Sequence, residues 1–195
     1  MDVILYRILR PIVNILFLVI FHPKIVGKEN IPKKGRTVLS GNHTSNLDWL
    51  LLISATRRPV HFLCKDSLNK GLLGSFLKQV GIIFVNRKIH DKGALNSAIE
   101  QLKMDRLIGI FPEGTINREK KEATLPFKIG SVKMAHDTDA LLVPFVITGK
   151  YKIFGGKLKI ELLEPMKIGD NLTEENDRLR GIISKRLEEY NGNTR

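Results

Sequence analysis

The chain has 195 residues, 43% of them hydrophobic, which is enough for one well-buried domain and too few for two ordinary ones. Its 32 lysine and arginine residues outnumber 20 acidic residues, and the formal net charge of +12 favours anionic partners such as nucleic acid, acidic lipid surfaces or phosphorylated substrates. The sequence lacks a zinc-ligand set, a helix-turn-helix and an aromatic RNA-binding signature, so we expect no nucleic acid among the partners.

Residues 1–23 form the first predicted element, an apolar segment that Arg7 and Arg10 interrupt. Two arginines near its middle would be costly at the centre of a bilayer, so a simple membrane span is not expected. Pro11 predicts a break between two short helices. Such helices, flanked by cations, predict insertion into one leaflet of an anionic membrane. The alternative is that the segment packs on the protein's own core.

Residues 24–195 form the second predicted unit, in which strand-like and helix-like stretches alternate. The predicted strands are 24–26, 37–40, 61–64, 82–85, 107–111, 141–147 and 158–163. The predicted helices are 48–55, 67–79, 93–104, 129–136 and 174–190. This alternation predicts an α/β fold with a single, mainly parallel sheet flanked by helices.

The segment Asn-His-Thr-Ser-Asn-Leu-Asp at 42–48 contains the first candidate site, between a predicted strand and a predicted helix. One α-helix would place His43 and Asp48 about 140° apart around its axis, but a tight turn, with Asp48 as the helix N-cap, can bring them together. The carboxylate would then fix the tautomer of the imidazole and leave its other nitrogen to act as a general base. The alternative is a loop histidine beside a simple helix cap.

Two further polar residues directly follow predicted strands. Arg87 has a guanidinium fork that suits phosphate oxygens, and Glu113 lies in Phe-Pro-Glu-Gly-Thr, where the proline and Gly114 predict a turn. Because ligand sites of open α/β sheets lie at the carboxyl ends of strands, one crevice can gather His43, Arg87 and Glu113. Taken alone, the arginine is more simply a surface charge and the glutamate an exposed turn residue.

Four segments, in this order and at these distances, resemble the motif blocks of the glycerolipid acyltransferase family, whose best-known bacterial members are the 1-acyl-glycerol-3-phosphate acyltransferases: 42–48, 81–87, 111–115 and 143–145. The resemblance runs from the apolar amino terminus to about Glu164. It implies a fold like that of glycerol-3-phosphate acyltransferase and an N-terminal membrane-binding element. It also implies acyl-CoA or acyl-ACP as co-substrate, without a resident cofactor.

The resemblance also implies roles for single residues. Arg87 matches the family arginine that is associated with the acceptor phosphate, and Lys128 is a second phosphate candidate. Glu113, with Gly114 and Thr115, would shape the acceptor loop: its carboxylate fixes the turn or binds glycerol hydroxyls, and nearby backbone N–H groups serve an oxyanion. The segment 143–145 is linked in relatives to acyl-chain or donor binding.

The sequence departs from the family pattern at two positions. Asn86 replaces a common acidic residue before the arginine of the second block, and Ile116 replaces a common arginine after the third. Arg118 can compensate for the second loss. The departures leave the chemistry of His43 and Asp48 untouched and concern how the acceptor phosphate is held.

We therefore predict an acyltransferase that moves a fatty acyl group to the sn-2 hydroxyl of lysophosphatidic acid, giving phosphatidic acid, with His43 and Asp48 as catalytic residues. The five histidines lack metal-ligand spacing, and no metal site is expected. The single cysteine favours a reducing compartment, so we expect a peripheral or monotopic protein on the cytoplasmic face of the cell membrane. Alternatives are another lysophospholipid or glycerol 3-phosphate as acceptor, a thioesterase or esterase, and a basic binding module without catalysis.

Overall fold

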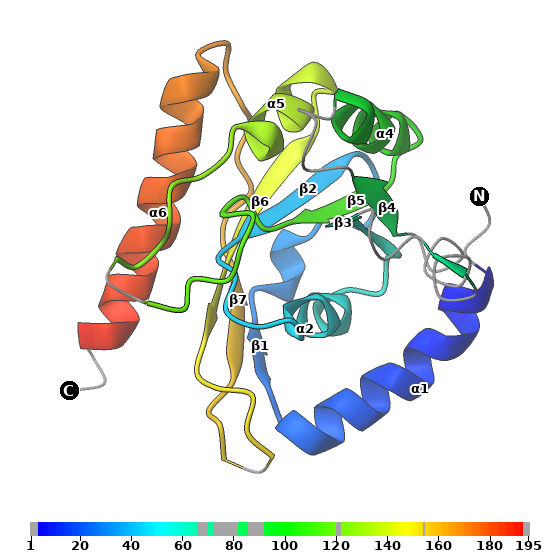
Figure 1. Ribbon diagram of the computed structural model, residues 1–195, viewed down its shortest axis with the longest axis vertical. Helices are drawn as coiled ribbons and strands as arrows, with labels where there is room; N and C mark the ends of the chain where they lie inside the picture. The colour runs from blue at the N-terminus through cyan, green and yellow to red at the C-terminus, as the bar shows by residue number, and fades with distance from the viewer. Residues whose placement is uncertain are drawn as a thin grey trace.

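The computed structural model describes residues 4–65, 70–71, 82–85, 92–119, 122–153 and 155–192, and within them seven strands form one sheet (Figure 1). The strands are β1 (Lys24–Val26), β2 (Thr37–Gly41), β3 (Val60–Lys65), β4 (Ile83–Val85), β5 (Leu107–Ile110), β6 (Leu141–Thr148) and β7 (Lys159–Leu162). Their order across the sheet is β1-β7-β6-β2-β5-β3-β4.

All neighbouring pairs in this order are parallel except β6 and β7. The predicted single, mainly parallel sheet is therefore confirmed, with one antiparallel pair added. The chain between β6 and β7 is too short for a crossover helix, so it returns as a hairpin and reverses direction.

Helices cover both faces of the sheet: α1 (Ile4–Phe21), α2 (Asp48–Ala55), α4 (Lys92–Lys103), α5 (Gly130–Asp137) and α6 (Leu172–Gly192), with a 3₁₀ turn at Lys28–Asn30. Side chains of β2 alternate between two buried clusters. Leu39 packs with residues of α1 and α2, whereas Val38 packs with residues of α4, α5 and α6. Burial on both faces explains why the strands appear as continuous apolar runs.

Each predicted strand is present, and the helices predicted at 48–55, 93–104, 129–136 and 174–190 correspond to α2, α4, α5 and α6. The helix predicted at 67–79 lies almost wholly outside the described residues.

The prediction of two short amino-terminal helices is wrong, because α1 is one helix with Pro11 inside it. A proline removes one backbone N–H and bends a helix without necessarily ending it. Next to it, Arg10 Nη2 donates a hydrogen bond to the carbonyl oxygen of Ile53, 3.2 Å away, and another to that of Thr56. These bonds to the carboxyl end of α2 hold the middle of α1 in place.

Helix α1 has one packed face and one exposed apolar face. Phe17 is only 4% exposed and belongs to the core beneath α2. Its exposed side, here named the outer face of α1, consists of hydrophobic residues: Ile12, Val13, Ile15, Leu16, Val19 and Ile20. None of the helices in the described part of the chain has the length and apolar character needed to cross a membrane.

Candidate active site

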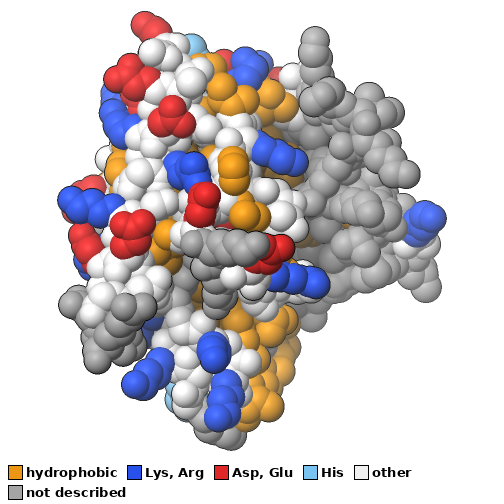
Figure 2. Space-filling view, turned by 60° about the vertical axis from the view of Figure 1, so that its left-hand side comes forward, with side chains coloured by type: hydrophobic (Ala, Val, Ile, Leu, Met, Phe, Trp, Pro, Cys, Tyr) orange, Lys and Arg blue, Asp and Glu red, His pale blue; other side chains and the backbone are white. Residues whose placement is uncertain are grey.

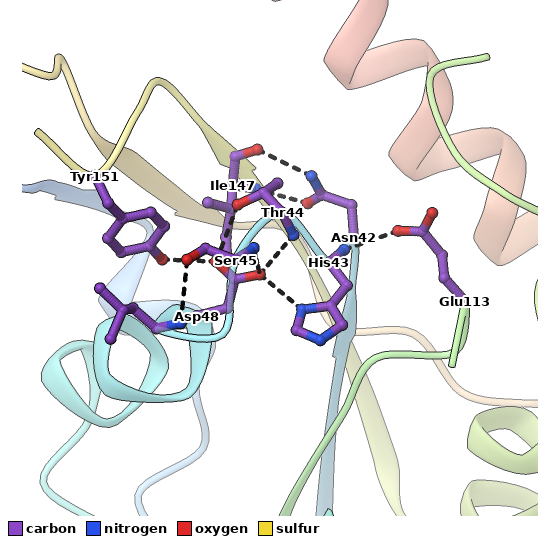
Figure 3. Close-up of polar contacts among 9 residues, drawn as sticks. Asn42, His43, Thr44, Ser45, Asp48, Glu113, Ile147 and Tyr151 are labelled. Carbon is purple, nitrogen blue, oxygen red and sulfur yellow. Dashed lines mark hydrogen bonds and ion pairs between the residues drawn. The ribbon is translucent and has the colours of Figure 1, made fainter. Parts of the chain in front are cut away.

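The turn between β2 and α2 places His43 against Asp48 at the carboxyl end of the sheet (Figure 3). His43 Nδ1 lies 2.8 Å from Asp48 Oδ2. The carboxylate is fully buried, while the imidazole side chain is 20% exposed. The contact that the sequence predicts is therefore present. Because Nδ1 faces the carboxylate, Nε2 is the nitrogen that can take up a proton.

Asp48 organises this turn and does not act as the predicted N-cap. It is the first residue of α2, and Leu47 occupies the N-cap position without a side-chain bond. Asp48 Oδ2 accepts hydrogen bonds from the backbone N–H groups of Thr44, at 2.6 Å, and Ser45, at 2.9 Å. The prediction failed because the carboxylate turns back to the N–H groups that precede the helix, where His43 also lies.

The other oxygen of Asp48 is held by two hydroxyl groups. Thr44 Oγ1 donates to Asp48 Oδ1 over 2.9 Å, and the phenol of Tyr151 donates to the same oxygen over 2.7 Å. Within the described residues, the donors to this carboxylate other than His43 are all neutral. Backbone N–H groups and hydroxyls thus stabilise its negative charge, an arrangement that suits a group meant to stabilise an imidazolium.

The imidazole is fixed from a second direction by an aromatic pair. The rings of His43 and Phe111 are stacked, with centroids 4.3 Å apart and an interplanar angle of 17°. Phe111 in turn meets Phe145 of β6 edge to face at 5.8 Å. Stacking on one side and the carboxylate on the other restrict the orientation of the ring.

Glu113 is buried and fixes the third motif to the first. Its Oε1 accepts the backbone N–H of His43 over 2.7 Å, and its Oε2 accepts that of Leu125 over 2.8 Å. Burial raises the pKa of Glu113, and the N–H bonds from Leu125 and His43 offset only part of this effect. An exposed turn glutamate, the simpler alternative, is thus wrong, and the geometry favours a loop-fixing role.

The predicted turn after β5 is present. Gly114 has a φ of +69°, a region that favours glycine, and its N–H donates to the carbonyl oxygen of Phe111 over 3.0 Å. This N–H is therefore engaged within the turn, which weakens it as the predicted oxyanion donor. A Cβ at this position would lie 3.0 Å from Nζ of Lys128, so the lysine side chain runs along the glycine. Lys128 and Thr115 are exposed.

Arg87 lies outside the described residues, together with Asn86. The segment at 143–145 lies inside β6, where Val143 and Phe145 are fully buried core residues. Its predicted link to donor binding stays a prediction, as do the roles of the site residues.

Two residues of the site were not found by sequence reasoning. Asn42 donates from Nδ2 to the carbonyl oxygen of Ile147 over 2.9 Å and accepts the N–H of Ile147 over 2.7 Å, which ties β2 to β6. Tyr151 lies 103 positions from Asp48 in sequence. The position of Asn42 next to His43 is a signal in the sequence that could have identified it, whereas no local sequence pattern identifies Tyr151.

A cavity of about 590 Å³ adjoins these residues on the side of α6. Its walls include Asn42, His43, Glu113, Asn117, Thr124 and Arg180. Most of the side chains in its walls can donate or accept hydrogen bonds. Among the residues that the structure describes, no cluster of three or more His, Cys, Asp or Glu could hold a metal ion.

Comparison with known proteins gives consistent results. The model of the acyltransferase family matches residues 22–148. The 1-acyl-sn-glycerol-3-phosphate acyltransferase of Borreliella burgdorferi is 38% identical over 67% of this chain and 52% of its own length. That of Bacillus subtilis is 31% identical over 75% of each chain. The crystal structure of the LPA acyltransferase PlsC from Thermotoga maritima has a TM-score of 0.77 at 24% identity, covering 95% of this chain and 79% of that one, and shows the same fold.

Proposed function

The chain belongs to the acyltransferase family, and we propose that it moves a fatty acyl group from acyl-ACP or acyl-CoA to the sn-2 hydroxyl of lysophosphatidic acid, giving phosphatidic acid. The observation that carries this proposal is the 2.8 Å contact between His43 and Asp48 beside a cavity at the carboxyl end of the sheet. The names of the relatives support lysophosphatidic acid as the acceptor, although the chain spans only about half of the Borreliella protein.

The proposed reaction is a direct acyl transfer without an enzyme nucleophile. His43 Nε2 takes the proton of the acceptor hydroxyl while its oxygen forms a bond to the thioester carbonyl carbon. The tetrahedral intermediate then collapses, the carbon–sulfur bond breaks, and the imidazolium returns the proton to the leaving thiolate. Asp48 stabilises the imidazolium throughout, and general-base assistance of this kind contributes about 10²–10⁴ in rate.

We assign acceptor binding to the loops around this pair. Lys128 supports the phosphate role because its ammonium lies beside Gly114 on the exposed surface. Arg87 remains a proposed phosphate ligand from its match to the family motif. Glu113, Gly114 and Thr115 would shape the acceptor loop, with both oxygens of the glutamate accepting backbone N–H groups.

The decisive test replaces the base. Purified His43→Ala, given lysophosphatidate and acyl-ACP or acyl-CoA, should form phosphatidate about 10²–10⁴-fold more slowly than the wild type. Its circular dichroism spectrum should be unchanged. His136→Ala is a matched control, because His136 also contacts aspartates, at 3.3 Å from Asp137 and from Asp170, but on the surface at the end of α5. Retention of more than a tenth of the rate in His43→Ala would show that His43 is not the base.

We further propose that α1 attaches the protein to an anionic membrane surface, on the cytoplasmic face of the cell membrane. The outer face of α1 supplies apolar side chains that are 36–61% exposed, and Trp49 of α2 is 40% exposed. Basic residues of the β6–β7 hairpin, Lys150, Lys152 and Lys157, are exposed as well. Figure 2 shows hydrophobic side chains beside lysine and arginine side chains at the lower end of the molecule.

Leu16→Glu tests this attachment, with Ile182→Glu as the control, because Ile182 is an exposed apolar residue of α6. Loss of one inserted leucine should weaken cosedimentation with phosphatidylglycerol vesicles about tenfold or more. The Ile182 variant should bind like the wild type. Equal binding by both variants would exclude the outer face of α1 as the attachment site.

A further inference from the structure

Tyr151 connects the buried side of α1 to the carboxylate of Asp48. It lies in the β6–β7 hairpin, and its hydroxyl donates to Asp48 Oδ1 over 2.7 Å (Figure 3). Its ring is 5.6 Å from that of Phe21, nearly edge to face, and 6.3 Å from that of Phe17. The two phenylalanines contact each other at 5.0 Å. Three elements distant in sequence thus meet at one phenol.

We infer that Tyr151 is a positioning residue, which aligns Asp48 with His43 and makes that alignment depend on the packing of α1. The inference rests on the proposed function, since it assigns a role within the same catalytic pair.

The hydrogen bond is one that only a protonated phenol can make. Burial, followed by the negative charge of Asp48 and the hydrogen bond to it, raises the pKa of Tyr151 well above its ordinary value. The hydroxyl therefore stays protonated and acts as a donor. It holds Oδ1, while Oδ2 faces His43, so loss of this bond lets the carboxylate rotate away from the imidazole.

The remaining donors to Asp48 cannot replace this connection. Thr44 and Ser45 belong to the same turn as the carboxylate and move with it. Tyr151 belongs to the connection between β6 and β7, which is a different part of the chain. Its bond therefore fixes Asp48 relative to the rest of the fold. Its ring is held in turn by Phe17 and Phe21, on the side of α1 away from the proposed membrane surface. A displacement of α1 would therefore move the phenol.

Tyr151→Phe removes the hydroxyl and keeps the ring, and Tyr190→Phe is its matched control. The phenol of Tyr190 also donates to a buried carboxylate, Glu161 Oε2 at 2.5 Å, but this pair lies between α6 and β7. Both variants are compared in kcat and KM with short-chain lysophosphatidate below its micelle concentration and without vesicles. The proton resonance of the His43 Nδ1–H group is recorded by NMR in parallel.

We expect Tyr151→Phe to lower kcat about tenfold with KM within about twofold, the size expected from losing one hydrogen bond to a charged acceptor. The Nδ1–H resonance of His43 should shift in this variant and stay unchanged in Tyr190→Phe. Phe21→Leu, which loosens the contact with Tyr151 while keeping an apolar side chain, should lower kcat less, by about threefold, in the absence of any membrane.

An unchanged kcat in Tyr151→Phe, with or without a shifted resonance, would overturn the inference. Failure of the proposed function is distinguishable from this result. If the wild type transfers no acyl group to any acceptor, the proposed function fails, whereas a resonance shift confined to Tyr151→Phe still supports the alignment of Asp48 by Tyr151. An unshifted resonance in that case would overturn both.

Discussion

Two buried carboxylates in this fold accept a hydrogen bond from a tyrosine, yet their other partners differ. Asp48, at the carboxyl end of the sheet, is surrounded by backbone N–H groups, hydroxyls and one imidazole. Glu161, on β7, accepts hydrogen bonds from two permanent cations, Arg186 at 2.7 Å and Lys159 at 3.1 Å. In the part of the chain that the structure describes, permanent cations therefore pair with the second carboxylate, whereas the first is held by neutral donors and one histidine.

The pKa of Glu161 reflects its cationic partners. Burial alone would raise the pKa of Glu161, but the hydrogen bonds from Arg186 and Lys159 outweigh it and hold the pKa below its ordinary value. The hydrogen bond to Glu161, with a second to Glu189, raises the pKa of Arg186. The bond between Arg186 and Glu161 attaches α6 to β7 and stabilises the fold. A carboxylate held by neutral donors can instead respond to a charge that forms during a reaction, as the proposed role of His43 requires.

The largest expected effect comes from removing the charge of Asp48. Asn fits the same space, since Thr44 and Tyr151 hydroxyls can rotate to accept its amide hydrogens. Without the negative charge the imidazolium is no longer stabilised, so the rate of acyl transfer by Asp48→Asn should fall about 10³-fold. Single-turnover acyl transfer measures this loss directly.

Glu161→Gln is the matched comparison for turnover. It removes the charge of the neutralised carboxylate and should keep transfer within about twofold of the wild type, since Glu161 contacts α6 and not His43. If Asp48→Asn loses no more activity than Glu161→Gln, the two carboxylates are both structural and the distinction between them is wrong.

Sequence reasoning found what local patterns encode. Strands buried on both faces appear as apolar runs, and the spacing of His43 and Asp48 fits one turn, so both were predictable. Partners of Asn42 and Tyr151 lie more than 100 positions away, and only the folded topology brings them together. The break expected at Pro11 failed because Arg10 anchors α1 to α2 through tertiary contacts that no propensity describes.

The smallest expected effect is on the free energy of unfolding, to which the paired charge of Glu161 contributes. Glu161→Gln should lower the free energy of unfolding at pH 7 by about 1–2 kcal/mol, less than for a fully buried pair because Arg186 is 37% exposed. Because the folded-state pKa of Glu161 lies below the ordinary 4.5, its contribution is present above that value and is lost as pH falls through the lowered pKa. Urea unfolding at several pH values should therefore show the difference between wild type and variant shrinking below about pH 4.5.

Glu189→Gln, which removes the more exposed partner of Arg186, should cost less than about 0.5 kcal/mol. A constant difference between wild type and Glu161→Gln across this pH range would mean that packing, and not the paired charge, gives Glu161 its role.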